Sequence, residues 1–223
     1  MDYKSEFITF MAQAGVLTFG DFTAKSGRKT PYFINTGRYN NGFHITRLGG
    51  FYADCIRTHF PKLPANTVLF GPAYKGIPIA VATAAAFAGH GINLKYSFNR
   101  KEEKDHGEGG SLVGHALTEG DPVLIVEDVI TAGTAIREVL PIIQQAKAEI
   151  LGLVISVNRM ERGQGSKTAI EEIKEAFGFD TYPIVTVLDI IECLYNKPVD
   201  GRIYIDDILK SRMEEYIKQY CII

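Results

Sequence analysis

An acid pair and a run of small residues follow one apolar segment of the chain, VLIVEDVITAGTA, residues 123–135. The run VLIV is typical of a buried strand, Glu127 and Asp128 come at its end, and Thr-Ala-Gly-Thr then opens a helical pattern. Free backbone N–H groups at a helix N-terminus, with hydroxyls from Thr131 and Thr134, can cradle a phosphate. The two carboxylates would accept hydrogen bonds from a ribose that carries this phosphate. The alternative is an acidic strand end before a Thr-capped helix, and the P-loop pattern G-x-x-x-x-G-K-[ST] is absent.

Two segments of the chain resemble motifs of a known family. The acid pair followed by TAGT is similar to the motif that binds phosphoribosyl pyrophosphate (PRPP) in type I phosphoribosyltransferases. FNRKEEKDHGEGGSLVG, residues 98–114, resembles the mobile catalytic lid of orotate phosphoribosyltransferases of the bacterial and yeast type, in both charge order and glycine placement. The resemblance covers nearly the whole chain, from FTAKSGRKTPYFIN near its start through the predicted strand that ends at Arg159.

The lid-like segment concentrates hydrogen-bond donors. Arg100, Lys101, Lys104 and His106 could surround a leaving pyrophosphate, and the glycines that follow would let the segment open and close. The alternative is a solvated loop, since the acids of the segment nearly balance its basic residues. The resemblance favours the lid.

GPAYKG, residues 71–76, directly follows another apolar run. Its Gly and Pro residues predict a tight turn that brings backbone amides and Lys75 toward an anion. By resemblance this is the pyrophosphate loop, in which Tyr74 has a matching place. The alternative is an ordinary strand-to-helix turn with a solvated lysine.

Two further segments match the part of the family that holds the base. In FTAKSGRKTPYFIN, residues 22–35, the residues matching Phe33 and Ile34 line the orotate pocket, and the lysine matching Lys25 approaches PRPP. Ile34 stands where many relatives carry an aromatic residue, so we expect a backbone contact there. The resemblance makes Arg159 the partner of the orotate carboxylate, which a planar guanidinium can bind in bidentate fashion. The alternative is a strand-end arginine paired with Glu161 or another acid.

The elements that must position these residues alternate along the chain. Short apolar runs begin at Val68, Ile92, Val123, Ile150 and Tyr182, and several are separated by helix-length segments at residues 77–89, 134–146 and 168–177. This alternation predicts an α/β fold with a mostly parallel sheet flanked by helices, as in the type I phosphoribosyltransferase fold. Helices are also expected at residues 45–60 and 206–219. We expect one domain over residues 1–223, with about residues 1–60 contributing a small cap or hood and the base pocket.

Composition narrows the class of protein. Of 223 residues, 46% are hydrophobic and 22% charged, enough to bury one substantial core. The formal net charge of -2 gives no global attraction to nucleic acid or membranes. Cys55, Cys193 and Cys221 are odd in number and lack C-x-x-C spacing, which argues against a disulfide framework or zinc site and fits a cytoplasmic protein. The first 15 residues do not resemble a signal peptide, and no apolar run reaches the roughly 18 residues of a membrane span.

The resemblance implies transfer of the 5-phosphoribosyl group from PRPP to orotate, giving orotidine 5'-phosphate and pyrophosphate, in de novo pyrimidine (UMP) biosynthesis. It also implies Mg²⁺ held mainly by PRPP and water, and a homodimer whose lid is shared across the interface, with no nucleic-acid or membrane partner. The expected catalytic residues are Arg100, Lys101, Lys104, His106 and Asp128. The expected PRPP-binding residues are Lys25, Tyr74, Lys75, Arg100, Lys101, Lys104, His106, Glu127, Asp128, Val129, Ile130, Thr131, Ala132, Gly133, Thr134 and Ala135. The expected orotate-binding residues are Phe33, Ile34, Thr131 and Arg159.

Two other functions are compatible with the PRPP-binding motif. A phosphoribosyltransferase for a purine or for uracil would not need Arg159, and a screen of bases separates it. A non-catalytic PRPP-binding regulator would show a basic excess or an added DNA-binding domain, and neither is present in this sequence. A fused enzyme that also decarboxylates the product is excluded by length, because a second barrel needs about 250 residues.

Overall fold

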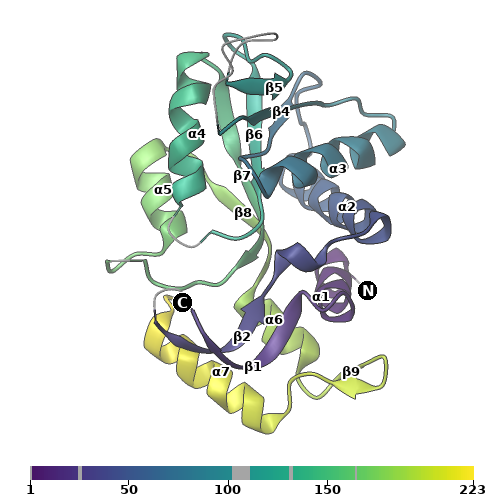
Figure 1. The fold of residues 1–223 in the computed structure, drawn as a ribbon, viewed down its shortest axis with the longest axis vertical. Helices are drawn as coiled ribbons and strands as arrows, with labels where there is room; N and C mark the ends of the chain where they lie inside the picture. Colours follow the sequence, from purple (N-terminus) through teal and green to yellow (C-terminus); the bar gives the residue numbers. More distant parts are fainter. Residues whose placement is uncertain (1, 25–26, 102–110, 131–132, 164) are drawn as a thin grey trace.

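The centre of the molecule is a six-stranded sheet with the strand order β5-β4-β3-β6-β7-β8 (Figure 1). The computed structural model describes residues 2–24, 27–101, 111–130, 133–163 and 165–223. Neighbouring strands run parallel, except that β5 pairs antiparallel with β4. The strands are β3 (Val68–Phe70), β4 (Lys95–Asn99), β5 (Leu112–Gly114), β6 (Pro122–Glu127), β7 (Glu149–Asn158) and β8 (Thr181–Thr186). This mostly parallel sheet, flanked by helices, confirms the predicted fold class.

Helices cover both faces of the sheet. Because its central strands are buried on both faces, they are apolar along their whole length. In β6, Val123 and Ile125 belong to the core cluster under α4 (Thr134–Gln145) and α5 (Ala169–Phe177). The alternate residues Leu124 and Val126 belong to the cluster on the other face, which includes residues of α2 (Gly42–His59) and α3 (Gly76–Gly89). The carboxyl end of β6 is therefore fixed from both sides.

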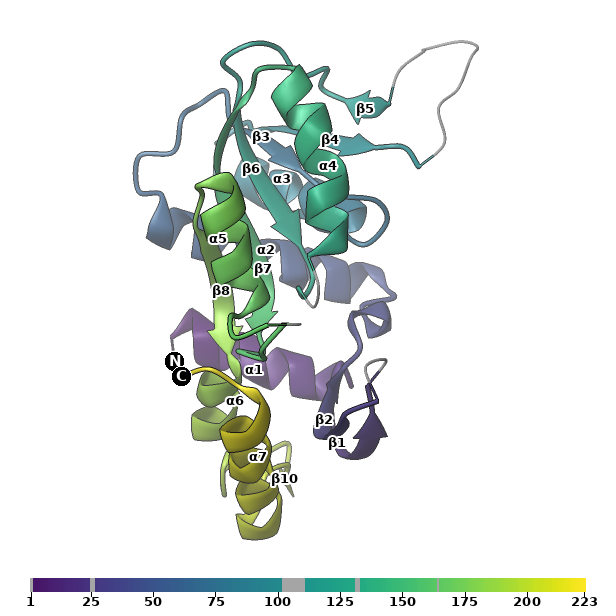
Figure 2. The same cartoon turned by 90° about the vertical axis from the view of Figure 1, so that its left-hand side faces the viewer.

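The N-terminal and C-terminal parts of the chain pack together beyond the carboxyl ends of β7 and β8 (Figure 2). From the N-terminal part come α1 (Tyr3–Gln13) and an antiparallel hairpin of β1 (Leu17–Thr23) and β2 (Lys29–Ile34), followed by a short 3-10 helix (Thr36–Arg38). From the C-terminal part come α6 (Val187–Leu194), β9 (Pro198–Val199), β10 (Arg202–Ile203) and α7 (Asp207–Tyr220). The rings of Tyr32 in β2 and Tyr216 in α7 lie 5.9 Å apart, so the two ends share one core.

The predicted strands and helices are all present, with two boundaries to correct. The helix expected from Ile45 begins at Gly42, because the Asn41 side chain caps it by accepting a hydrogen bond from His44 N. The strand expected from Ile92 begins at Lys95, because Lys95 is the residue opposite Val68, where β3 itself begins. The hairpin, β5, α6 and the β9–β10 pair were not predicted. Among the described residues, no helix combines the length and apolar character needed to cross a membrane.

Candidate active site

The acid pair lies at the carboxyl end of β6. Glu127 is the last residue of the strand and Asp128 follows it, and both are buried, with 6% and 8% of their surface exposed. Gly133 then adopts a left-handed conformation with φ of 69°, and α4 begins at Thr134. A β-carbon at Gly133 would lie 3.3 Å from the Ile173 side chain, so glycine suits both the backbone conformation and the available space.

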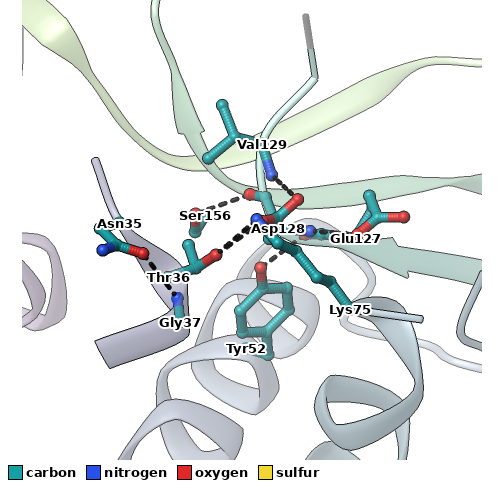
Figure 3. Close-up of polar contacts among 9 residues, drawn as sticks. All are labelled: Asn35, Thr36, Gly37, Tyr52, Lys75, Glu127, Asp128, Val129 and Ser156. Atoms are coloured by element: carbon teal, nitrogen blue, oxygen red, sulfur yellow. Dashed lines mark hydrogen bonds and ion pairs between the residues drawn. The ribbon is translucent and has the colours of Figure 1, made fainter. Parts of the chain in front are cut away.

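The carboxylate of Asp128 is the centre of a polar cluster (Figure 3). Its Oδ2 accepts hydrogen bonds from Lys75 Nζ at 2.7 Å and from Thr36 Oγ1 at 2.7 Å, while its Oδ1 accepts one from Val129 N at 2.6 Å. The backbone oxygen of Asp128 accepts hydrogen bonds from Ser156 N and Ser156 Oγ, at 2.8 and 2.6 Å. These bonds tie the carboxylate of Asp128 to the 3-10 helix and the loop after β3, and its backbone to β7.

The carboxylate of Glu127 is buried and has fewer hydrogen-bond partners than that of Asp128. Its Oε1 accepts a hydrogen bond from Asp128 N at 2.9 Å, and its backbone oxygen accepts one from the Tyr52 hydroxyl of α2 at 2.6 Å (Figure 3). Burial, together with the neighbouring charge of Asp128, raises the pKa of Glu127 to about 8. The acid pair therefore carries less than its full two negative charges at neutral pH.

The GPAYKG loop connects β3 to α3 and brings Lys75 to the acid pair. A β-carbon at Gly71 would lie 2.2 Å from the backbone oxygen of Gly76, so only glycine allows this turn. Ala73 N donates to Asn99 Oδ1 at 2.8 Å, which ties the loop to β4, and the Ala73–Tyr74 peptide is cis. The Tyr74 side chain is exposed. The loop thus presents one cation, Lys75, toward the carboxyl end of β6.

A pocket of about 220 Å³ opens beside Lys75 and Asp128. Polar groups of Thr36, Lys75, Asp128 and Ser156 line one part of it. Apolar side chains of α2 and α3 line another part, namely Ile45, Leu48, Pro78 and Ile79. Such a pocket, apolar with a few convergent polar groups, is typical of a small-molecule site.

The residues expected to hold the base come from β2 and from the end of β7. Phe33 is 41% exposed, and its ring lies 5.6 Å from that of Phe22 across the hairpin. Ile34 packs against the core from a partly buried position. The guanidinium of Arg159 lies 4.6 Å from the centre of the Tyr32 ring and bonds to Glu161, with Nε 2.7 Å from Oε1. Although burial opposes it, the electrostatic interactions with Tyr32 and with the Glu161 carboxylate raise the pKa of Arg159, which stays a cation.

The structure brings Lys75, Glu127 and Asp128 together, and places Val129, Ile130, Gly133, Thr134 and Ala135 on the segment that leads into α4. Arg100 directly follows β4, and Lys101 Nζ lies 3.8 Å from Glu138 Oε2 and 5.5 Å from the centre of the Tyr74 ring. The remaining expected residues fall outside the described part of the chain, namely Lys25, Lys104, His106, Thr131 and Ala132.

Three residues of the site were not predicted from sequence: Thr36, Tyr52 and Ser156. Ser156 gave a usable signal, because it is a polar residue inside the apolar run ILGLVISV, and a buried hydroxyl needs a hydrogen-bond partner. Thr36 and Tyr52 gave none, because their importance depends on how separate elements pack. Within the described ranges, no cluster of three or more His, Cys, Asp or Glu residues could hold a metal ion.

Comparison with known proteins places this site in a family. Residues 46–182 match the family described as phosphoribosyl transferase domain. The chain is 56% identical to the orotate phosphoribosyltransferase of Clostridium beijerinckii over 220 residues, covering 98% of this chain and 97% of the relative. The orotate phosphoribosyltransferase of Clostridium acetobutylicum is 53% identical with the same coverage. The crystal structure of the Francisella tularensis enzyme of that name superposes with a TM-score of 0.83 at 33% identity, covering 97% of this chain and all of the other.

Proposed function

We infer that this chain, which belongs to the orotate phosphoribosyltransferase family, transfers the 5-phosphoribosyl group of PRPP to orotate in pyrimidine biosynthesis. The products are orotidine 5'-phosphate and pyrophosphate. The observation that carries this inference is the nearly full-length identity with enzymes of that name. The whole chain, residues 1–223, acts as a single domain in this proposal.

The acid pair binds the ribose of PRPP. Displacement at the anomeric carbon develops positive charge on the sugar, so carboxylates that hold its hydroxyls both orient it and stabilise that charge. Asp128 is the better placed of the two, because its carboxylate already accepts hydrogen bonds from a hydroxyl and an ammonium group. The segment Val129 to Ala135, with Thr131, Ala132, Gly133 and Thr134, cradles the 5'-phosphate at the N-terminus of α4.

Lys75 exchanges partners when PRPP binds. Its ammonium group is paired with Asp128, while 64% of its side chain is exposed. An exposed lysine is loosely held, so a pyrophosphate group can draw the ammonium away from the carboxylate. The exchange frees Asp128 Oδ2 for the ribose and places a cation on the leaving group. Tyr74, next to Lys75, shapes the loop.

Arg159 selects the base. Its planar guanidinium suits the carboxylate of orotate, while Phe33 contacts the flat ring and the backbone of Ile34 its edge. Lys25 on the PRPP side and Thr131 on the orotate side complete the set of contacts. A base without a carboxylate leaves the buried cation of Arg159 without a ligand partner, so such a base is rejected.

Mg²⁺ binds mainly through oxygens of PRPP and water. The donor set fits such an ion, because Asp128 offers a hard carboxylate oxygen beside the pocket. When bound, the ion supplies positive charge that offsets the charge of the leaving pyrophosphate. Asp128 and Glu127 are the side chains that would help PRPP and water to hold it.

The lid supplies the remaining cations. Arg100, Lys101, Lys104 and His106 stabilise the departing pyrophosphate, and the lid of one subunit closes over the PRPP site of its partner in a homodimer. Support for a lid shared between subunits comes from the family resemblance. Within one chain, the Lys101 ammonium group lies beside the exposed Tyr74 ring of the pyrophosphate loop, which supports a role for this cation near the pyrophosphate.

The decisive experiment is the loss of orotate absorbance when the protein is mixed with PRPP and Mg²⁺. We expect the loss to require all three components, and uracil, hypoxanthine and adenine to give no product in parallel reactions. Turnover of one of these bases in place of orotate would identify a phosphoribosyltransferase of another specificity. PRPP binding without any turnover would indicate a regulator.

A further inference from the structure

Arg159 directly follows β7, and its guanidinium is held along one edge. Nε donates to Glu161 Oε1 at 2.7 Å, and Nη2 lies 2.5 Å from the same oxygen. Only 11% of the Arg159 side chain and 20% of the Glu161 side chain are exposed. Both contacts use the Nε–Nη2 edge, and Nη1 takes part in neither. The ion pair therefore leaves the outer side of the guanidinium for another group.

Glu161 is itself held in place by the C-terminal part of the chain. The Tyr216 hydroxyl of α7 donates to Glu161 Oε1 at 2.7 Å. Glu161 also forms a β-bridge with Cys221, flanked by hydrogen bonds from Arg162 N to Tyr220 O and from Ile222 N to Met160 O, both at 2.9 Å. The position of this carboxylate is thus set by α7 and by the last residues of the chain, far from β7 in sequence.

The guanidinium also lies against an aromatic ring. Tyr32 is fully buried, and its ring centre lies 4.6 Å from Arg159 Cζ. Tyr32 also packs edge-on against Tyr216, with the ring centres 5.9 Å apart. Because Phe33 is the next residue of β2, the face that orients Arg159 and the ring expected to contact the base belong to the same strand.

We propose that Glu161 and Tyr216 are positioning residues that fix Arg159 for the carboxylate of the base. The inference rests on the proposed function, since it names how the same site recognises orotate. A guanidinium has several donors in a rigid plane, so fixing one edge determines where the other points. A long arginine side chain without such a partner would lose rotamer freedom each time it bound substrate, at a cost in affinity.

The opposite role for Glu161 is also physically possible. Its carboxylate could occupy the place of the substrate carboxylate, so that orotate must displace it. The two roles predict opposite effects of removing Glu161. A positioning residue is needed for tight orotate binding, whereas a displaced residue competes with it. The contact to Nε, and the second anchor from Tyr216, favour positioning.

The test is steady-state kinetics of Glu161→Ala, Glu161→Gln and Tyr216→Phe, with melting curves for each. We expect Glu161→Ala to raise the orotate KM about tenfold, equivalent to about 1.4 kcal/mol, with the PRPP KM within about twofold of wild type. Glu161→Gln keeps an acceptor oxygen and should recover much of the loss. Tyr216→Phe should change orotate KM in the same direction by about threefold. Where Glu161→Ala does not fold, Tyr216→Phe decides in its place.

A matched control is Tyr195→Phe. The Tyr195 hydroxyl also donates to a carboxylate, Asp207 Oδ1, at 2.8 Å, but it contacts neither Arg159 nor Glu161. This variant should leave both KM values unchanged. An orotate KM that is unchanged or lower in Glu161→Ala, or KM values for orotate and PRPP that rise together, would overturn the proposal. If the wild-type protein does not consume orotate, or Arg159→Ala is not selective for it, the proposed function itself fails.

Discussion

Two buried acids at opposite ends of β6 allow binding to be separated from folding. Asp128 follows the carboxyl end of the strand and lines the pocket, whereas Asp121 precedes the amino end. Asp121 Oδ2 accepts hydrogen bonds from Thr118 N at 2.8 Å, Thr118 Oγ1 at 2.9 Å and His115 Nε2 at 2.8 Å. Although burial opposes it, these partners lower the pKa of Asp121 to about 2. Replacing each acid by asparagine removes one charge and almost no volume.

The expected effects on stability can be worked from these contacts. The Lys75–Asp128 pair is largely solvated on the lysine side, and removing the charge of Asp128 also relieves its repulsion of Glu127, so the net cost should be no more than about 1 kcal/mol of unfolding free energy. Asp121→Asn disturbs a carboxylate with three accepted hydrogen bonds, and we expect a cost of roughly 2–3 kcal/mol. For a chain of this size the Tm should fall by about 2–4 °C for Asp128→Asn and by at least about twice that for Asp121→Asn.

For PRPP binding, in contrast to stability, we expect the larger effect from Asp128→Asn. A hydrogen bond from a ribose hydroxyl to a charged carboxylate contributes about 1.5–3 kcal/mol, so Asp128→Asn should weaken PRPP binding by about 10- to 100-fold. Asp121→Asn should leave PRPP affinity within about threefold of wild type, because it lies at the far end of the strand. The assays are calorimetric titration of PRPP with Mg²⁺, beside melting curves. PRPP affinity that is unchanged in Asp128→Asn, or reduced equally in both variants, would refute the assignment of the acid pair.

Three further outcomes are expected. Arg159→Ala should raise the orotate KM by the equivalent of about 2–5 kcal/mol and change the PRPP KM little, and equal changes in the two KM values would contradict its role. Because the pKa of Glu127 is raised from 4.5 to about 8, the folded state favours its protonated form, so wild-type stability should fall as pH rises from 4.5 through 8. Denaturant titrations of Glu127→Gln at pH 5 and pH 9 should show a smaller decline, and an identical decline would place the pH dependence elsewhere. Lys101→Ala and Gly133→Asp, each inactive alone, should recover about a quarter of full activity after equal amounts are refolded together, since a hybrid dimer with a shared lid holds one intact site; hybrids that form but stay inactive would rule out the shared lid.

The sheet and its acid pair could be predicted because each is indicated by a few consecutive residues of the sequence. An apolar run such as VLIV predicts a strand wherever it lies in the sheet, and the chemistry of a parallel sheet gathers at the carboxyl ends of its strands. Glu127, Asp128 and Lys75 each follow such a run within a few residues. Predicting the contact between Lys75 and Asp128, whose charged groups lie 2.7 Å apart, therefore needed only the correct assignment of two strands. These strands, β3 and β6, are neighbours in the sheet.

The contribution of α7 to holding Glu161 beside Arg159 could not be predicted, because it depends on contacts between distant parts of the chain. The Tyr216 hydroxyl reaches Glu161 across 55 positions, and the Tyr32 ring reaches Tyr216 across a larger separation. Nothing in the local sequence of α7 indicates a role near the base, since its apolar spacing is that of any helix covering a core. Likewise, no sequence pattern indicates a role for Thr36, which contacts Asp128 only because the 3-10 helix places it there.

The two charged groups at the strand ends are both paired within the chain, but the pairs differ in a way that bears on ligand entry. Asp128 is paired with a lysine whose side chain is 64% exposed, whereas Arg159 is paired with a glutamate that is 20% exposed and held by Tyr216. Breaking the first pair releases a solvated lysine, and Asp128 keeps the hydrogen bonds from Thr36 Oγ1 and Val129 N, so the cost is small. Breaking the second would leave a buried charge without a partner, at a cost of about 3–5 kcal/mol. A ligand at the end of β6 can therefore replace Lys75, whereas a ligand at the end of β7 must bind beside Glu161, on the side of the guanidinium that Glu161 leaves open.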